Sequence, residues 1–143
     1  MGSKWEHFGH AAHFICGHNC RFHLATLVGK FLVSTVGELV PDESSREIYA
    51  RSKGVALKGR GDERLYSFLK KHGFVELGYQ RTYETMVFKA GKPCIAKHCH
   101  CGLPAIDGSE LDFAGYNNAK AATDGHRKLC LKWSKKKGAI NAK

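Results

Sequence analysis

The sequence predicts an α+β fold, in which an antiparallel sheet of two hairpins carries two to three helices and a C-terminal segment rich in Cys and His. Three observations lead to this prediction. Apolar and β-branched runs occupy residues 20–37 and 74–88, segments with helical periodicity follow each of them, and three cysteines and two histidines gather within residues 94–101. Hairpins around a helical middle are typical of α+β domains.

The size and composition of the chain fit one domain with a packed core. The chain has 143 residues, of which 43% are hydrophobic and 10% aromatic, well outside the range of disordered chains. We expect one domain over residues 1–143, divided into a sheet core at 1–90, a Cys/His loop and helix at 91–134, and a basic tail at 135–143.

Residues 20–37 give the clearest strand pattern. Gly29 and Lys30 lie between two apolar runs as a two-residue turn with glycine first, which is typical of a tight β-hairpin. Counting outward from this turn pairs Val28 with Phe31 and places three facing pairs on one side of the sheet. Those pairs are Val28 with Phe31, Thr26 with Val33, and Leu24 with Thr35. Both sides of the hairpin are largely apolar, which predicts a central position in its sheet.

Two helices are expected between the hairpins. Acids and serines after Pro41 predict a short helix that ends near Gly54, and Asp62 and Gly73 are typical cap and stop residues for a second one. Residues 74–88 then predict a second hairpin, with a turn around 78–81 and a strand that ends at Phe88.

The C-terminal segment has a helical repeat of apolar and ligand-type residues. One face of this helix would carry Ala119, Ala122, His126, Leu129, Cys130 and Trp133. Gly125 lies within the segment and costs about 1 kcal/mol of helix stability relative to alanine.

The Cys/His loop and this helix together predict a zinc site. Zinc takes four Cys or His ligands, and a close pair on a turn is usually completed by a pair from a second element. His126 and Cys130 lie one helical turn apart, as such a pair requires. Four of five residues would bind the ion: Cys94, Cys99, Cys101, His126 and Cys130. His98 and His100 are weaker candidates because they alternate with the cysteines.

The N-terminal segment holds further ligand types. Cys16, Cys20 and His23 with an earlier histidine would hold a second ion, although buried cysteines beside the hairpin and solvated histidines are the favoured interpretation. A nucleophilic Cys16 or Cys20 with His18 or His23 as base, and Glu38 or Glu84 as the assisting acid, is a third alternative. Disulfides are less favoured, because we expect a reducing compartment.

Three acids, Asp107, Glu110 and Asp112, follow the Cys/His loop. They would bind a divalent ion in a nuclease centre, but such acids more often cap and solubilise a loop.

The charge balance points to a polyanionic partner. The formal net charge is +10, and an excess of this size is the usual footprint of nucleic-acid binding. The sequence therefore predicts a zinc-stabilised binding protein, without catalysis, for nucleic acid or an acidic protein surface. The alternative is a metal-dependent nuclease or other hydrolase. The expected phosphate contacts are Lys128, Lys132, Lys135, Lys136 and Lys137, with a second patch at Arg60, Arg64, Lys70 and Lys71.

The sequence shows neither a signal-like apolar run nor a stretch of 18 apolar residues. We therefore expect a soluble cytoplasmic protein that makes no contact with a membrane.

Overall fold

The fold was analysed in a computed structural model that describes residues 4–8, 20–39, 67, 69–71, 73–74, 76–77, 80–94 and 104–136. The predicted helix at 42–54, most of the Cys/His loop and the basic tail beyond residue 136 lie outside these residues.

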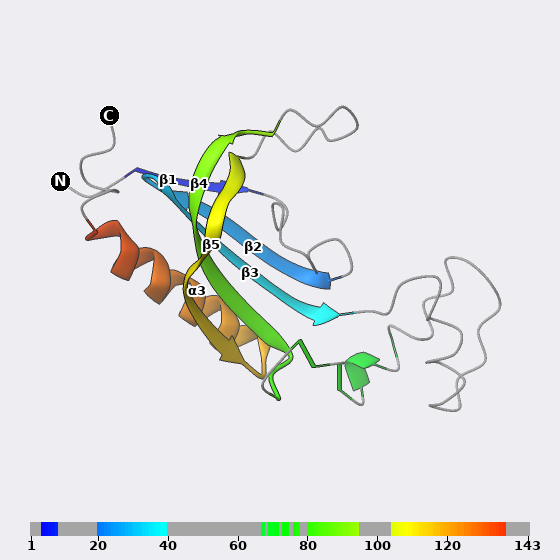
Figure 1. Cartoon of the computed structure of the whole chain (residues 1–143). Coiled ribbons are helices and arrows are strands. Elements are labelled where there is room, and N and C mark those ends of the chain that lie inside the picture. The colour runs from blue at the N-terminus through cyan, green and yellow to red at the C-terminus, as the bar shows by residue number, and fades with distance from the viewer. Residues whose placement is uncertain are drawn as a thin grey trace.

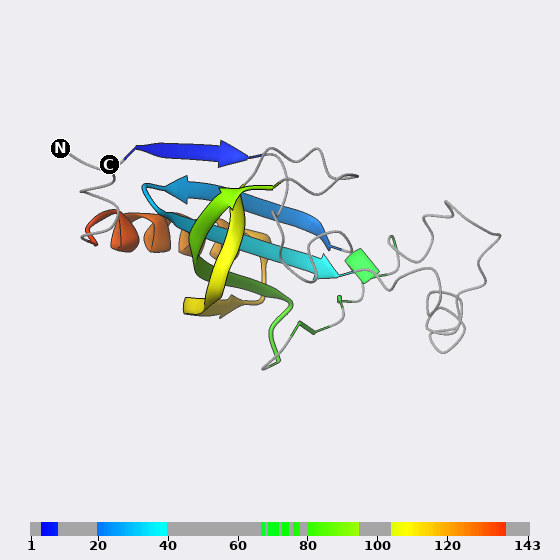
Figure 2. The ribbon, with the colours of Figure 1, turned by 45° about the horizontal axis from the view of Figure 1, so that its top comes forward.

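The described residues form one antiparallel sheet with helix α3 on one face (Figures 1 and 2). The strands follow one another in the sheet in the order of the sequence, β1-β2-β3-β4-β5. Their bounds are β1 Trp5–Phe8, β2 Cys20–Val28, β3 Phe31–Leu39, β4 Tyr83–Pro93 and β5 Pro104–Tyr116, and α3 is Ala119–Ser134. An α+β arrangement is confirmed at this level.

The hairpin of β2 and β3 has the predicted register. Val28 pairs with Phe31, Thr26 with Val33 and Leu24 with Thr35, and Gly29 takes the positive φ of 60° that this tight turn needs. Residues 32–37 of β3 are buried on both faces, and β3 lies between β2 and β4 at the centre of the sheet, as predicted for an apolar central strand.

The second hairpin differs from the prediction. The strand expected to end at Phe88 continues to Pro93, and its hairpin partner is β5. Residues 74, 76 and 77 are not in a strand. Their pattern was apolar enough for a strand, but the amide of Leu77 donates to the carbonyl of Arg81 in a local turn instead. Residues 67 and 69–71 are helical, and the Gly73 amide donates to the Leu69 carbonyl at 2.7 Å, as expected of a helix that ends there.

Strands β4 and β5 bend together in Figure 1, where they rise from the level of α3 and curve over the sheet. Their pairing shifts between Val87 and Lys89 and again between Ala90 and Pro93. Such irregularities sharpen the twist and bend a strand pair. The bend leaves one end of β5 beside α3.

The core on the helix side contains Val28, Val33, Val87, Leu129 and Cys130. Asn118 caps the N-terminus of α3, and its side chain accepts a hydrogen bond from the amide of Ala121 at 2.8 Å. Its buried residues are Ala122, Gly125, His126, Leu129 and Cys130, which lie on the face that the periodicity predicted.

Candidate functional site

The last two turns of α3 are fixed to β5 by one carboxylate. Asp112 accepts a hydrogen bond from Lys132 Nζ at 2.7 Å and one from Trp133 Nε1 at 3.0 Å. Burial raises the pKa of Asp112, but these two hydrogen bonds and the charge of Lys132 outweigh that effect and leave it below its usual value. The carboxylate therefore stays ionised and holds the C-terminal turns of α3 against β5.

His126 is the central polar group between helix and sheet. Only 6% of it is exposed, and both ring nitrogens meet hydroxyl groups of the sheet. Thr26 Oγ1 lies 2.8 Å from Nε2, and Thr35 Oγ1 lies 2.7 Å from Nδ1. Thr26 is on β2 and Thr35 on β3, so one imidazole is hydrogen-bonded to two neighbouring strands.

The hydrogen bonds continue beyond His126 in both directions. Nδ1 of His7 lies 2.8 Å from Thr26 Oγ1, and Thr85 Oγ1 lies 2.6 Å from Thr35 Oγ1. Tyr116 also hydrogen-bonds Thr85 through its side chain. The network thus takes one residue from each of the five described strands and one from α3: His7, Thr26, Thr35, Thr85, Tyr116 and His126.

Burial determines the protonation state of His126. Desolvation and, to a smaller extent, the charge of His7 lower the pKa of His126 to about 4, so the ring is neutral at pH 7. A neutral imidazole donates at one nitrogen and accepts at the other. One threonine hydroxyl therefore donates to His126, and the other accepts from it.

The hydroxyl of Thr26 has three partners. Besides His7 and His126 it hydrogen-bonds Cys130, and burial raises the pKa of that thiol to about 11 in spite of this bond. A hydroxyl has one hydrogen and two lone pairs, so three partners satisfy Thr26 completely. The network is accordingly ordered, and Cys130 is a protonated thiol within it.

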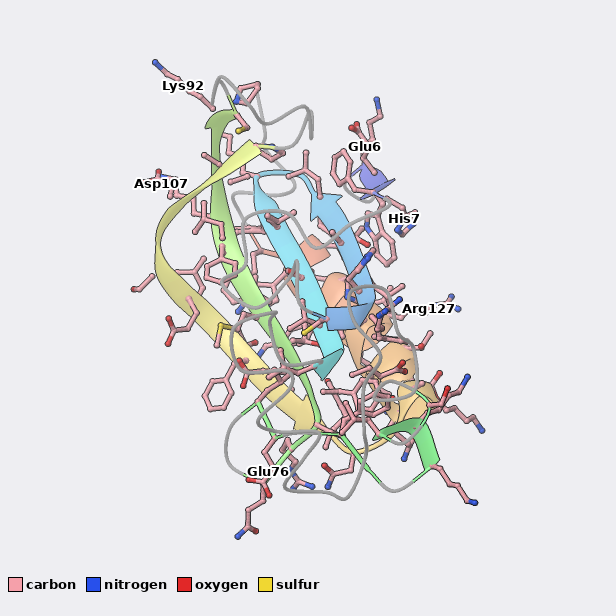
Figure 3. The ribbon with its side chains drawn as sticks, turned by 90° about the vertical axis from the view of Figure 1, so that its right-hand side faces the viewer. Glu6, His7, Glu76, Lys92, Asp107 and Arg127 are labelled. Atoms are coloured by element: carbon pink, nitrogen blue, oxygen red, sulfur yellow. The ribbon has the colours of Figure 1, made fainter. Side chains whose placement is uncertain are left out.

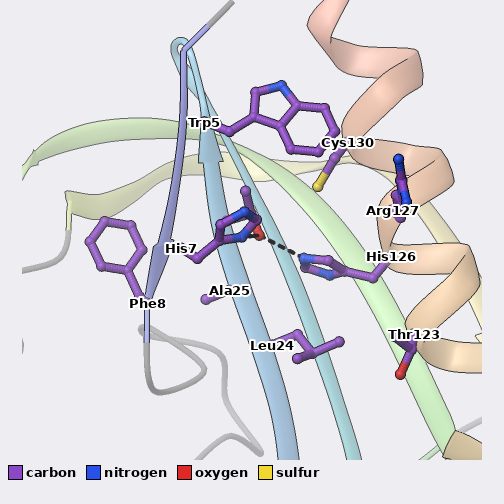
Figure 4. A pocket seen from close by; sticks show the side chains of 10 residues that line it. Trp5, His7, Phe8, Leu24, Ala25, Thr123, His126, Arg127 and Cys130 are labelled. Carbon is purple, nitrogen blue, oxygen red and sulfur yellow. Dashed lines mark hydrogen bonds between the residues drawn. The ribbon is translucent and has the colours of Figure 1, made fainter.

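A pocket of about 380 Å³ opens above this network, between β1, β2 and α3. In the close view of Figure 4, His7 and His126 face each other from opposite sides, Trp5 and Cys130 lie at one end, and Thr123 lies at the other. Arg127 also lines the pocket. Its volume is in the range of small-ligand sites.

The opposite side of α3 forms a second, more open hollow of about 550 Å³. Four lysines and one exposed leucine line it: Lys128, Lys132, Lys135, Lys136 and Leu131. We call these five residues the lysine groove. Nζ of Lys136 lies 5.3 Å from the centre of the Trp133 ring, within cation–π range.

The predicted zinc ligands are only partly described. His126 and Cys130 lie in the buried network, Cys94 follows the end of β4, and Cys99 and Cys101 lie outside the described residues. Within the described part of the chain no group of three or more Cys, His, Asp or Glu side chains is placed to hold a metal. Zinc binding by His126 would require the ring to lose its hydrogen bond to Thr26 or to Thr35. The zinc site stays a prediction.

Two other candidate sets are described only in part or serve different contacts. Cys20 is buried beside Val36, Leu39 and Leu77, as favoured for a core cysteine, while Cys16 and His18 lie outside the described residues. The three acids after the Cys/His loop belong to strand β5 and not to a loop. Asp107 lies 3.7 Å from Lys89, whereas Asp112 binds Lys132, so the carboxylates of Asp107 and Asp112 have different partners.

Sequence reasoning missed the threonines and the role of His7. Thr26 and Thr35 were placed on the hairpin correctly, but as sheet residues without function. Their hydrogen-bond partner His126 lies 100 and 91 positions away in the sequence. The one available signal was three threonines at inward-facing positions of otherwise apolar strands, since buried hydroxyls need partners.

No family model matches the chain, and comparisons with curated proteins and with solved structures found no significant match either. None of the helices in the described part of the chain is both long and apolar enough to cross a membrane.

Proposed function

We propose that this protein binds a polyanion, with nucleic acid as the favoured partner, through the lysine groove on α3. The observation that supports this proposal best is the convergence of Lys128, Lys132, Lys135 and Lys136 on one hollow surface. Lys128 and Lys132 lie one turn apart on α3, and Lys135 and Lys136 follow at its C-terminal end. A cluster of cations of this kind can neutralise several phosphates of a nucleic-acid backbone.

Positive charge predominates on α3 and at its C-terminal end. Exposed cations occur along the helix and at its end, whereas its first turn contains no acid. Between residues 119 and 136 there is one acidic side chain, Asp124, and there are six cationic ones: Lys120, Arg127, Lys128, Lys132, Lys135 and Lys136. The concentration of positive charge toward the C-terminal end also complements the negative end of the helix dipole.

The four groove lysines do not contribute equally. Asp112 neutralises Lys132 at 2.7 Å, and that contact holds the helix in place. Lys128, Lys135 and Lys136 are exposed and supply the cations for a partner. Three phosphate contacts give a slope of about −3 when the logarithm of affinity is plotted against the logarithm of salt concentration.

The proposal extends to two features of the sequence outside the groove. Lys70 and Lys71 are exposed and form a second contact patch, whose other members, Arg60 and Arg64, lie outside the described residues, as does Lys137 of the tail. The zinc ion predicted from the Cys and His residues would have a structural role and would take no part in binding.

The experiment compares two triple variants of equal charge. Lys128→Gln, Lys135→Gln and Lys136→Gln remove three charges from the groove. Lys30→Gln, Lys89→Gln and Lys92→Gln remove three exposed charges from the hairpin turn and from β4. Each set lowers the formal net charge from +10 to +7. Fluorescence anisotropy of labelled single- and double-stranded oligonucleotides measures affinity across a salt series.

We expect the groove variant to lose affinity tenfold or more, at about 1 kcal/mol per exposed phosphate contact, and the slope against salt to become shallower by about 3, the share of the three lost contacts. The control variant should lose much less. Equal losses in both variants would mean that net charge alone attracts the polyanion, without a defined site. If pull-downs recover an acidic protein that nuclease treatment leaves bound, nucleic acid is the wrong partner.

A further inference from the structure

The pocket between β1, β2 and α3 combines a buried polar floor with an exposed rim that carries one arginine and one histidine. Thr26, His126 and Cys130 at the floor are at most 6% exposed, whereas His7 and Arg127 at the rim are exposed. The lining residues within the described part of the chain include no carboxylate. A pocket with this charge selects an anion over a cation.

His7 is held in place from two sides. Its Nδ1 is hydrogen-bonded to Thr26 Oγ1 at 2.8 Å, and the edge of its ring meets Trp5 with a centroid separation of 6.3 Å and an interplanar angle of 78°. Thr26 is held in turn by His126 and Cys130. This support directs the remaining nitrogen, Nε2, without the entropy cost of ordering a mobile side chain on binding.

Arg127 supplies the cationic group of the pocket. It lies one residue from His126 on α3, lines the same pocket, and takes part in neither the Lys132–Asp112 nor the Lys89–Asp107 ion pair. A guanidinium group presents paired N–H donors that match two oxygens of one phosphate. The view in Figure 3 shows Arg127 and His7 on the same side of the molecule.

We propose that this pocket binds the phosphate group of a nucleotide, with Arg127 and Nε2 of His7 as the phosphate ligands. The apolar walls formed by Trp5 and Leu24 would contact the base or the sugar. The identification of the phosphate as that of a nucleotide rests on the proposed function. The pocket is nevertheless separate from the lysine groove, because Arg127 and its neighbour Lys128 line different hollows.

The test uses adenosine 5′-monophosphate, adenosine and inorganic phosphate as probes, titrated into the full chain by isothermal calorimetry. We expect the nucleotide to bind more tightly than adenosine, which lacks the phosphate, and more tightly than inorganic phosphate, which lacks the apolar part. Nucleotide binding no tighter than that of adenosine overturns the proposal. Binding of inorganic phosphate with equal affinity would limit the site to free phosphate and also contradict it.

Two pairs of exposed residues, one pair on α3 and one on β1, provide the variants. Arg127→Gln should weaken nucleotide binding tenfold or more, while Lys120→Gln, an equal charge loss elsewhere on α3, should change it less than twofold. His7→Gln should weaken binding in the same way, with Glu6→Gln on β1 as control. All four side chains are exposed, and circular dichroism verifies that each variant is folded. Wild-type affinity in Arg127→Gln would refute the assignment.

Failure of this inference and failure of the proposed function have different signatures. Oligonucleotide affinity that depends on the groove lysines, in a chain that does not bind the mononucleotide, refutes the pocket alone. Mononucleotide binding that depends on Arg127, in a chain whose groove variant keeps its oligonucleotide affinity, refutes the groove alone.

Discussion

The hydroxyl of Thr35 on β3 lies 2.7 Å from Nδ1 of His126 on α3. This contact joins the centre of the sheet to the helix at a site that excludes water, since Thr35 is fully buried. Thr35 also meets Thr85 at 2.6 Å, so removal of its hydroxyl affects two partners together. The helix is thus positioned by polar contacts as well as by apolar packing.

Replacement of Thr35 by valine should therefore destabilise the protein. The substitution conserves volume but leaves Nδ1 of His126 without its hydroxyl partner, and a buried polar group left unpaired costs about 1–3 kcal/mol. Urea unfolding measures the change. The control is Thr123→Val, which removes an exposed hydroxyl that donates to the Ala119 carbonyl on the same helix and should cost less than about 0.5 kcal/mol. Equal effects at both positions would show that the network contributes nothing.

The protein should also become less stable as the pH is lowered from 6.5 to about 4, where His126 is neutral in the folded protein but protonated in the unfolded chain. The pKa of His126 is about 4 in the folded protein, against 6.5 for an ordinary histidine. Below pH 6.5 the unfolded chain takes up a proton that the folded chain refuses, so stability decreases until the pH reaches about 4. Since each pKa unit corresponds to about 1.4 kcal/mol, the total loss is about 3 kcal/mol.

Urea unfolding at several pH values between 7 and 4 measures this slope. The same series for His126→Gln isolates the contribution of the ring, because glutamine does not titrate. We expect the variant to be less stable at pH 7 and to depend less on pH. A variant with the wild-type slope would assign the pH dependence to other groups.

The sequence identified those elements whose signals are local. The hairpin of β2 and β3 was predicted to the register because Gly29 fixes the turn and the pairing follows from it. Helix α3 was predicted from its repeat. Strand β5 was missed because an exposed edge strand that carries Asp107, Gly108, Ser109 and Glu110 lacks the apolar alternation of a strand.

The site could not be predicted in the same way. His126 appeared at its correct place on the buried face of α3, but its ligand chemistry suggested a metal, since histidine and cysteine one turn apart are a frequent ligand pair. The alternative partners, Thr26 and Thr35, approach His126 only when the sheet is complete. Contacts between residues 91 and 100 positions apart have no local pattern.

Gly125 shows how the folded contacts change the interpretation of one residue. By helix propensity alone, alanine at this position is more favourable by about 1 kcal/mol. A Cβ atom there would overlap the ring and the hydroxyl of Tyr116, which belongs to the buried network. The glycine therefore permits the close approach of α3 to β5.

Gly125→Ala should accordingly lower the free energy of unfolding by about 1–3 kcal/mol, because overpacking outweighs the propensity gain. In a Tyr116→Ala background the clash is absent, and the same substitution should stabilise the protein by up to about 1 kcal/mol. Thermal or urea unfolding of the four proteins completes this double-mutant cycle. A destabilising Gly125→Ala in both backgrounds would contradict the proposed contact.

The zinc prediction can be tested by separating the loop cysteines from the helix pair. Cys130 is fully buried in the core beside Val28, Val33 and Leu129, and both ring nitrogens of His126 already meet threonine hydroxyls, so zinc binding by this pair would break buried contacts. We therefore expect any zinc to be held by Cys94, Cys99 and Cys101, with His98 or His100 as the fourth ligand. Elemental analysis of protein purified without added metal should find one zinc per chain. Cys99→Ala should lose the zinc and Cys130→Ala should retain it. A Cys130→Ala protein that is folded but free of zinc would show instead that Cys130 of the helix is a zinc ligand.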